Sequence, residues 1–180
     1  MTRLFALHDA MFGQIESRLA WLSPTLARLV FAGVLLVYFW NSARTKLGDG
    51  PLGFLHPANG AYFQIFPKAA EAVGYDSSQL STLQTLVVLA GTWAEFLLPL
   101  LIVLGLFTRL AALGMAGFIV MQSLTDVYGH GVAGDDLGAW FDAASSALIL
   151  DQRALWGLLL TVLVLRGAGP LSVDRLLGRA

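Results

Sequence analysis

The chain has no cysteine and little charge, and these two absences exclude several classes of chemistry. Without Cys among its 180 residues, the chain itself cannot form disulfides, attack as a thiolate or exchange thiols. A net charge of -1 argues against nucleic acid as a partner. The sequence also has no Gly-rich phosphate loop, no Ser/His/Asp set and no haem-type pair of histidines at membrane depth. Any redox role therefore has to depend on a bound cofactor or a partner.

Apolar residues dominate what is present. The chain is 57% hydrophobic and only 13% charged, with a mean hydropathy of +0.70, which indicates an integral membrane protein. Each membrane-spanning helix needs roughly 20 residues, so we predict an all-α fold, a single four-helix transmembrane bundle over residues 24–177. Residues 1–23 form an amphipathic segment that we expect on the membrane surface, and interfacial helices are expected in the outward loops. The predicted spans cover about 25–47, 83–107, 110–127 and 145–166.

The second and third predicted spans are joined by a very short connection. Only Thr108 and Arg109 separate the second span from the third, which predicts a tight antiparallel helical hairpin. We expect Arg109 to anchor a lipid phosphate rather than bind substrate.

The fourth span has to accommodate Asp151 and Arg153. Either these charges lie at the interface at the start of a short span, or residues 140–150 form an interfacial helix that turns into the span.

The distribution of Lys and Arg predicts the orientation. Positive residues near span ends are retained on the cytoplasmic side, so both termini are predicted to be cytoplasmic and the two longer connections to face outward. With four spans, seven of the 11 cations fall on the side of the termini and four on the other: Arg3, Arg18, Arg28, Arg109, Arg166, Arg175 and Arg179 against Arg44, Lys46, Lys68 and Arg153.

Glu95 is the main candidate for a functional residue, because it is the one carboxylic acid near the middle of the apolar run 83–107. Ionisable groups at membrane depth are costly and are often functional. Its predicted counter-ions are Lys46, Arg44 and Arg28 on the first span. Two interpretations stay open: a site between the first two spans for a quinone head group, an anion or a proton, and an inter-helical ion pair that only orders the bundle.

Other polar and aromatic residues are assigned to the same candidate ligand or proton site. Thr92 and Trp93 precede the acid and are placed against the pocket, although plain packing explains them as well. Gln122 and Asp126 lie one helical turn apart, where they extend a polar path from Glu95 to water or simply cap the third span. No compact metal-ligand motif is present, so no metal site is predicted.

The sequence around the hairpin resembles the DoxX family. The resemblance rests on AEFLLPLL at 94–101 and LGLFTRLAA at 104–112, with weaker support from Lys46-Leu47 and from GPLSVD at 169–174. Two departures stand out. Ser42 and Ala43 occupy the place of the glycine that the family often has before the lysine, and Leu98-Pro99 replaces a small Gly pair after the acid.

The resemblance implies a four-helix bundle in a bacterial-type inner membrane. Some relatives form the membrane subunit of a thiosulfate:quinone oxidoreductase, and others associate with redox or metal-handling proteins. For this chain the expected function is a membrane component of a redox system that interacts with quinone through Glu95 and Lys46. The alternative is a non-catalytic accessory, an anchor or a small transporter for a partner, a metal or a metabolite. Self-association into a homo-oligomer is left open.

Overall fold

The computed structural model describes residues 2–179, and these residues are almost entirely helical. Within that range there is no strand, only an isolated bridge between Leu47 and Pro57. The α-helices are α1 (Thr2–Leu19), α2 (Leu22–Phe31), α3 (Val37–Arg44), α4 (Asn59–Ile65), α5 (Pro67–Ala72), α6 (Thr82–Leu104), α7 (Thr108–Leu124), α8 (Leu150–Arg166) and α9 (Val173–Leu176). Short π- and 3-10 turns link several of them: π turns at Ala32–Leu36 and Thr125–Gly129, and 3-10 turns at Ser77–Gln79 and Gly134–Asp136.

Three continuous helical segments are long and apolar enough to cross a membrane: Leu22–Arg44, Thr82–Leu104 and Thr108–Gly129. The fourth helix, α8, has 17 residues, which corresponds to about 26 Å and is slightly short of the roughly 30 Å hydrocarbon layer. It begins at Leu150 rather than at residue 145. Residues 140–149 form turns and irregular backbone and no interfacial helix, and the carboxylate of Asp151 accepts a hydrogen bond from the amide of Ala147 at 2.9 Å.

The first span contains a π turn that keeps its buried side chains on one face. Its buried residues recur every four positions, at Ala27, Phe31, Leu35, Phe39 and Ala43. In a regular α-helix each such step drifts by about 40°. The wider π turn at Ala32–Leu36 inserts one extra residue and so removes about 100° of that drift. Phe31 and Phe39 are therefore both fully buried.

The hairpin between α6 and α7 has a longer turn than the two residues predicted. α6 ends at Leu104, and Gly105 adopts the left-handed conformation (φ +70°) that commonly ends helices. Phe107 is also left-handed (φ +49°) and precedes α7 directly. Thr108 and Arg109 thus belong to the first turn of α7. The antiparallel packing of α6 on α7 is as predicted.

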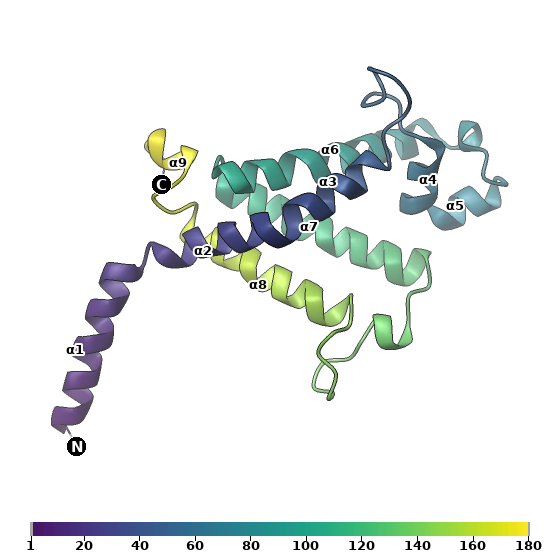
Figure 1. Ribbon diagram of the computed structural model, residues 1–180. Helices are drawn as coiled ribbons and strands as arrows, with labels where there is room; N and C mark the ends of the chain where they lie inside the picture. Colours follow the sequence, from purple (N-terminus) through teal and green to yellow (C-terminus); the bar gives the residue numbers. More distant parts are fainter. Residues whose placement is uncertain (1, 180) are drawn as a thin grey trace.

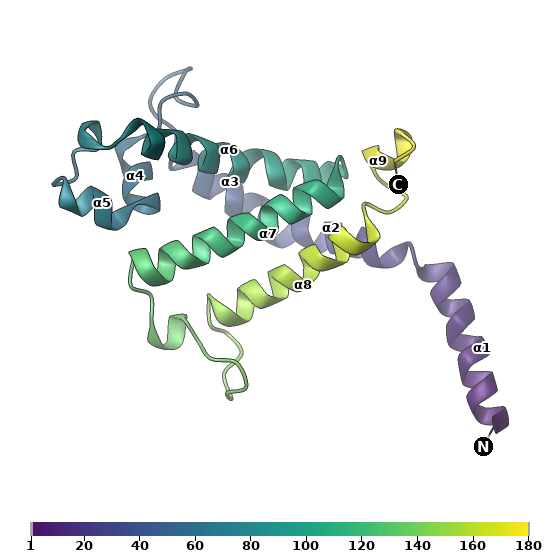
Figure 2. The ribbon, with the colours of Figure 1, turned by 180° about the vertical axis from the view of Figure 1, so that it is seen from behind.

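The four long helical segments pack around one apolar core. α7 contacts both α6 and α8, and the first span contacts α6 and α8 (Figures 1 and 2). The core includes Phe31, Phe39, Ile102, Met115 and Leu160, all fully buried. The starts of α2 and α7 and the ends of α6 and α8 lie at one end of this group, which we call the terminal end (Figure 1). The connections that contain α4 and α5 lie at the other end, which we call the loop end.

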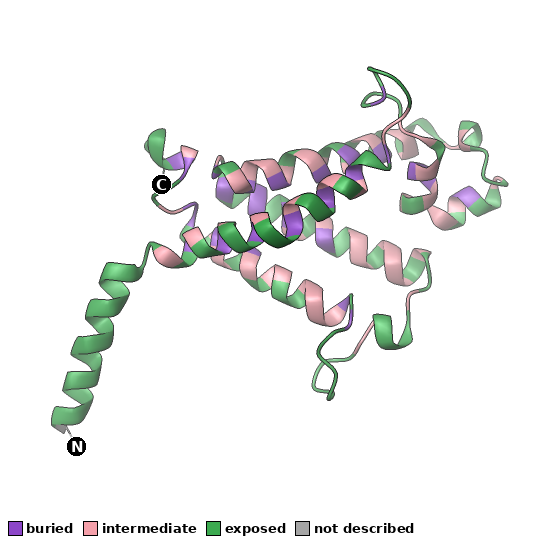
Figure 3. Ribbon diagram, viewed as in Figure 1, coloured by how far each residue is buried: buried purple, intermediate pink, exposed green. Residues whose placement is uncertain are grey.

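The amphipathic segment forms the helix α1, which projects away from the other helices (Figures 1 and 3). All its side chains from Arg3 to Leu19 are exposed, including Leu4, Phe5 and Leu7 at 76%, 63% and 70%. An apolar stripe left uncovered in this way is typical of a helix that lies on a membrane surface.

Candidate functional site

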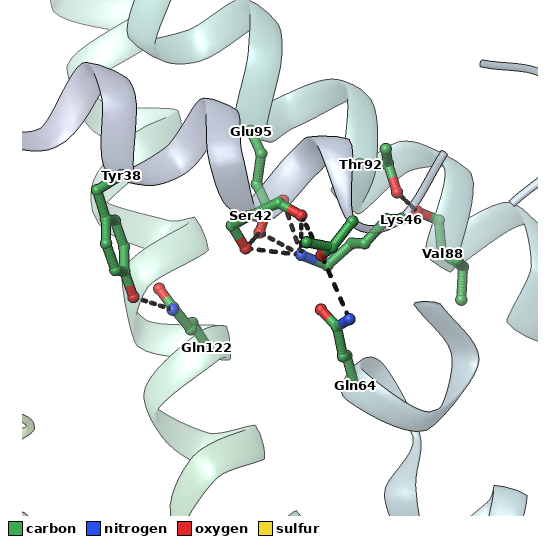
Figure 4. A network of polar contacts seen from close by, with 9 residues as sticks. Tyr38, Ser42, Lys46, Gln64, Val88, Thr92, Glu95 and Gln122 are labelled. Carbon is green, nitrogen blue, oxygen red and sulfur yellow. Dashed lines mark hydrogen bonds and ion pairs between the residues drawn. The ribbon is translucent and has the colours of Figure 1, made fainter. Parts of the chain in front are cut away.

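A buried ion pair joins the first span to α6. The Lys46 ammonium group lies 2.9 Å from Oε2 and 3.1 Å from Oε1 of Glu95. Both residues are buried, with 5% and 3% of their surfaces exposed. Figure 4 shows the ammonium group between Glu95 and the end of α3. A lysine next to the carboxylate supplies the compensation that a charge at this depth requires.

Ser42 connects the two charged groups. Its hydroxyl accepts a hydrogen bond from Lys46 Nζ at 2.8 Å and donates to Glu95 Oε1 at 3.2 Å, and its carbonyl accepts from Lys46 Nζ at 3.1 Å. Because Ser42 and Lys46 are four residues apart, they lie on the same side of the chain as it leaves α3. All hydrogen-bonding capacity of the ammonium group is therefore used within the protein, whereas the carboxylate accepts from only two residues and keeps acceptor capacity in reserve.

The backbone next to Glu95 is opened by a proline. Pro99 lies inside α6 and has no N–H to donate to the carbonyl of Glu95, four residues earlier. One turn of the helix is thereby weakened. The indole of Trp40 on α3 donates to the neighbouring carbonyl of Phe96 at 3.1 Å and so ties α3 to this turn of α6.

A cavity of about 580 Å³ begins at the ion pair and runs between α6 and α7. Its volume lies within the range of small-molecule sites. Ser42, Lys46 and Glu95 form one polar wall, and small residues provide the space, among them Gly91 on α6 and Gly117 on α7. A Cβ atom added at Gly117 meets no atom within 4 Å.

The cavity opens sideways between α6 and α7. Its rim includes Val87 and Ala90 of α6 and Gly117 and Met121 of α7, all of them exposed. These two helices are membrane-span candidates, so their exposed faces suit contact with lipid. A molecule dissolved in the membrane would reach Glu95 from this side without passing through water.

Gln122, Asp126 and His130 line the far part of the same cavity. The Gln122 amide donates to the Tyr38 hydroxyl at 3.1 Å, and its oxygen is buried without a partner among the described residues. Asp126 forms an ion pair with Arg153 of α8. The structure therefore brings Gln122 and Asp126 into one cavity with Glu95, and their role as a polar path stays a prediction.

Four of the predicted site residues do not meet Glu95 or line the cavity. Arg44 is exposed and contacts Asn41 at 3.4 Å, and Arg28 lies at the terminal end, so neither is a counter-ion of Glu95. Trp93 is exposed, and its indole donates to the carbonyl of Phe54 at 2.8 Å. The buried hydroxyl of Thr92 donates to the carbonyl of Val88 at 2.8 Å, the usual internal bond of a threonine in a helix.

Arg28 instead ties together the ends of two helices. Its guanidinium donates to the carbonyls of Ile102 and Val103 at the end of α6, and to those of Ala168 and Leu171 after α8. Carbonyls at helix C-termini lack partners within their own helix. One cation thus satisfies four acceptors.

Asp174 performs the complementary task at the start of α7. Its carboxylate accepts from the amides of Phe107 and Thr108 at 2.8 and 2.9 Å and from the Thr108 hydroxyl at 2.8 Å. Burial acts to raise the pKa of Asp174, but these hydrogen bonds outweigh it and hold the pKa below its ordinary value. We call Arg28 and Asp174, with the backbone groups that they bind, the terminal latch.

Ser42 and Gly117 were not predicted from the sequence as parts of the site. The four-residue spacing between Ser42 and Lys46 could have indicated Ser42, because it places both residues on one side of a helix. Gly117 is one of many small residues in apolar helices, and its place beside the cavity depends on the rotation of α7, which the sequence does not specify.

Among residues 2–179, no group of three His, Cys, Asp or Glu side chains is arranged to hold a metal ion. The sequence model of the DoxX family matches residues 23–125, which include all but the first residue of the first span, together with α6, α7 and both members of the ion pair. No curated protein and no solved structure matches the chain. Because the family match covers more than half of the chain, this protein belongs to the DoxX family.

Proposed function

We propose that the protein is a membrane component of a redox system and that the cavity beside Glu95 binds the head group of a membrane quinone or quinol. In this proposal the first span, α6, α7 and α8 form a four-helix bundle in a bacterial-type inner membrane, with both termini cytoplasmic. The observation that carries the proposal is the position of the Glu95–Lys46 pair on the wall of a cavity that opens between two apolar helices.

The chemistry of the cavity fits a quinol better than a simple anion. Glu95 retains acceptor capacity beside its bonds to Lys46 and Ser42, so a quinol hydroxyl has an acceptor there. A free anion would meet the same carboxylate and be repelled. The remaining wall is largely apolar, with Leu98, Phe118 and Met121 beside the glycines, as a flat ring and an isoprenoid tail require.

The internal satisfaction of Lys46 favours a second function. Its ammonium group needs no ligand, because Ser42 and Glu95 already accept its hydrogen bonds. This supports a non-catalytic accessory in which the pair only orders the helices while the protein anchors a soluble redox or metal-handling partner or transports a small molecule.

Filling the cavity from α7 distinguishes the two functions. Gly117→Leu adds a side chain at a position where its Cβ meets no atom within 4 Å, and it retains both members of the ion pair. Gly157→Leu on α8 is the matched control, because that glycine also has no atom within 4 Å of the added carbon and does not line the cavity. The measurement is equilibrium binding of a short-tailed benzoquinol to the purified full chain in lipid nanodiscs.

The proposed function predicts that Gly117→Leu weakens binding at least tenfold and that Gly157→Leu changes it less than twofold. One bulky residue in a fitted site typically has an effect of this size, about 1–3 kcal/mol. Equal binding by both variants, or no binding by the wild type, contradicts the quinol site and leaves the accessory function.

A further inference from the structure

A second cavity lies at the terminal end, beside the latch and on the outer surface of α7 and α8. It has a volume of about 180 Å³, and its lining includes three arginines from three parts of the chain: Arg109 in the first turn of α7, Arg166 at the end of α8 and Arg179 after α9. The floor is formed by backbone and small side chains, among them Gly167 and Ala168.

The three arginines line this cavity without a close ionic partner in the described part of the chain. Within residues 2–179, none of them forms an ion pair or donates a side-chain hydrogen bond. Arg109 packs over Gly167, where an added side-chain carbon would lie 3.3 Å from Nε. Arg179 lies over the ring of Phe107 at 4.8 Å from its centroid. These contacts place two of the arginines while leaving their hydrogen-bond donors available.

The single acid of this cavity offsets only part of the positive charge. Asp174 is buried and accepts three hydrogen bonds from Phe107 and Thr108, so its oxygens are directed to the start of α7. Three cations against one anion leave a net charge of +2 in the cavity. Clustered arginine donors are the typical recognition group for phosphate oxygens.

The surroundings of the cavity match a lipid more closely than a soluble anion. α7 begins and α8 ends at this cavity, so it lies where an apolar helix leaves the hydrocarbon layer. Leu110, which is 69% exposed, is part of the lining and continues onto the lipid-facing side of α7. A phosphate held by the arginines would leave an acyl chain to run along Leu110.

From this geometry we propose that Arg109, Arg166 and Arg179 form a binding site for the phosphodiester head group of an anionic phospholipid. The site is independent of the cavity at Glu95, because the two cavities share no lining residue. Lipid bound there would bridge α7, α8 and the C-terminal segment at the terminal end.

The test compares lipid retention by the full chain in detergent, measured by native mass spectrometry with equimolar phosphatidylglycerol and phosphatidylcholine. Arg109→Gln with Arg166→Gln removes two of the three donors. Arg18→Gln with Arg175→Gln is the matched control, since it removes the same charge from exposed arginines outside the cavity. Arg179→Gln is a milder variant that alters no long helix.

The wild type is expected to retain phosphatidylglycerol in preference to phosphatidylcholine. Each arginine near a headgroup contributes about a fivefold effect, so we expect about 25-fold weaker retention in the double variant, about fivefold in Arg179→Gln and less than twofold in the control. If the control and the double variant lose lipid retention equally, the loss reflects the net positive charge of the protein and not a specific site, and the proposal is overturned. If millimolar inorganic phosphate displaces the lipid fully, the site takes a free anion and the lipid assignment is wrong.

Discussion

Each end of the helix group has an acid and a base that bind groups of the protein, but the two ends use them differently. At the terminal latch, Arg28 and Asp174 bind backbone carbonyls and amides at helix ends. Near the loop end, Lys46 and Glu95 bind each other and Ser42. The latch therefore completes the hydrogen bonding of several helix ends. In the Glu95 pair only Lys46 has such a contact, to the carbonyl of Ser42 in the last turn of α3, and the carboxylate of Glu95 binds side chains alone.

This difference separates charges that the fold needs from charges that are left for function. A buried pair between side chains is weak evidence for stability, because an apolar pair of the same size often serves as well. The Glu95 pair also lies on the wall of the larger cavity. Burial alone therefore does not identify a functional acid, whereas its partners and the space beside it do.

The largest expected effect comes from breaking the Glu95 pair on one side. Lys46→Ala leaves a buried carboxylate without its cation, and we expect the free energy of unfolding to fall by about 3–5 kcal/mol. The double variant Lys46→Met with Glu95→Gln should recover most of this loss. Unfolding by SDS in mixed micelles measures both. If the double variant is as unstable as Lys46→Ala, the pair is a structural necessity and the contrast with the latch disappears.

Removal of the cation from the latch is expected to have the next largest effect. Arg28→Met removes a charged donor from four carbonyls, two at the end of α6 and two after α8, of which that of Ile102 keeps the amide of Gly105. Hydrogen bonds to charged groups contribute about 1.5–3 kcal/mol. We expect a loss near the upper part of that range in the same unfolding assay. No second substitution should restore it, because the partners are backbone atoms. Recovery by Asp174→Asn would show that the latch is a side-chain pair after all.

Asp174→Asn should be milder and should depend on pH. Loss of an N-terminal cap costs about 1 kcal/mol. The folded pKa of Asp174 is lowered, so its carboxylate contributes stability that is fully present above the unfolded pKa of about 3.9 and is lost as pH falls through the folded pKa. The difference in stability between wild type and variant should therefore shrink below about pH 4. A difference that stays constant from pH 7 to pH 3 contradicts this role.

The smallest effect is expected at the proline in α6. Trp40→Phe keeps the ring contact with Phe96, at 6.4 Å between centroids, but removes the donor to the Phe96 carbonyl. A single neutral hydrogen bond contributes about 0.5–1.5 kcal/mol, and we expect a loss at the lower end of that range. Trp93→Phe, which removes a similar bond to the Phe54 carbonyl outside the helices, is the control and should change stability less.

The general features of the fold were predictable because they follow from composition and periodicity. Three apolar helices of sufficient length lie where the sequence predicts spans, and the α6–α7 hairpin follows from the short polar interval between them. Their limits were less predictable. The left-handed Gly105 ends α6 three residues before the predicted limit at Phe107, and the late start of α8 depends on local contacts of Asp151.

For the candidate site, the sequence indicated the acid but did not specify which of three cations accompanies it. Lys46, Arg44 and Arg28 all lie on or beside the first span. Arg28 is excluded by its position at the terminal end, and the rotation of the chain at the end of α3 decides that Lys46 rather than Arg44 faces Glu95. The terminal latch was missed for a related reason. Its partners are backbone groups brought together by the C-terminal segment, and residue spacing gives no sign of such contacts.

The most direct test of the functional account is the position at which a photoreactive quinone labels the protein. The full chain in nanodiscs is irradiated with a short-tailed azidoquinone, and the labelled peptides are identified by mass spectrometry. If a quinone binds beside Glu95, labels appear on the facing parts of α6 and α7 around Gly91 and Gly117, and they are lost in Gly117→Leu but not in Gly157→Leu. Labels spread over all lipid-facing helices, with no response to Gly117→Leu, would contradict it.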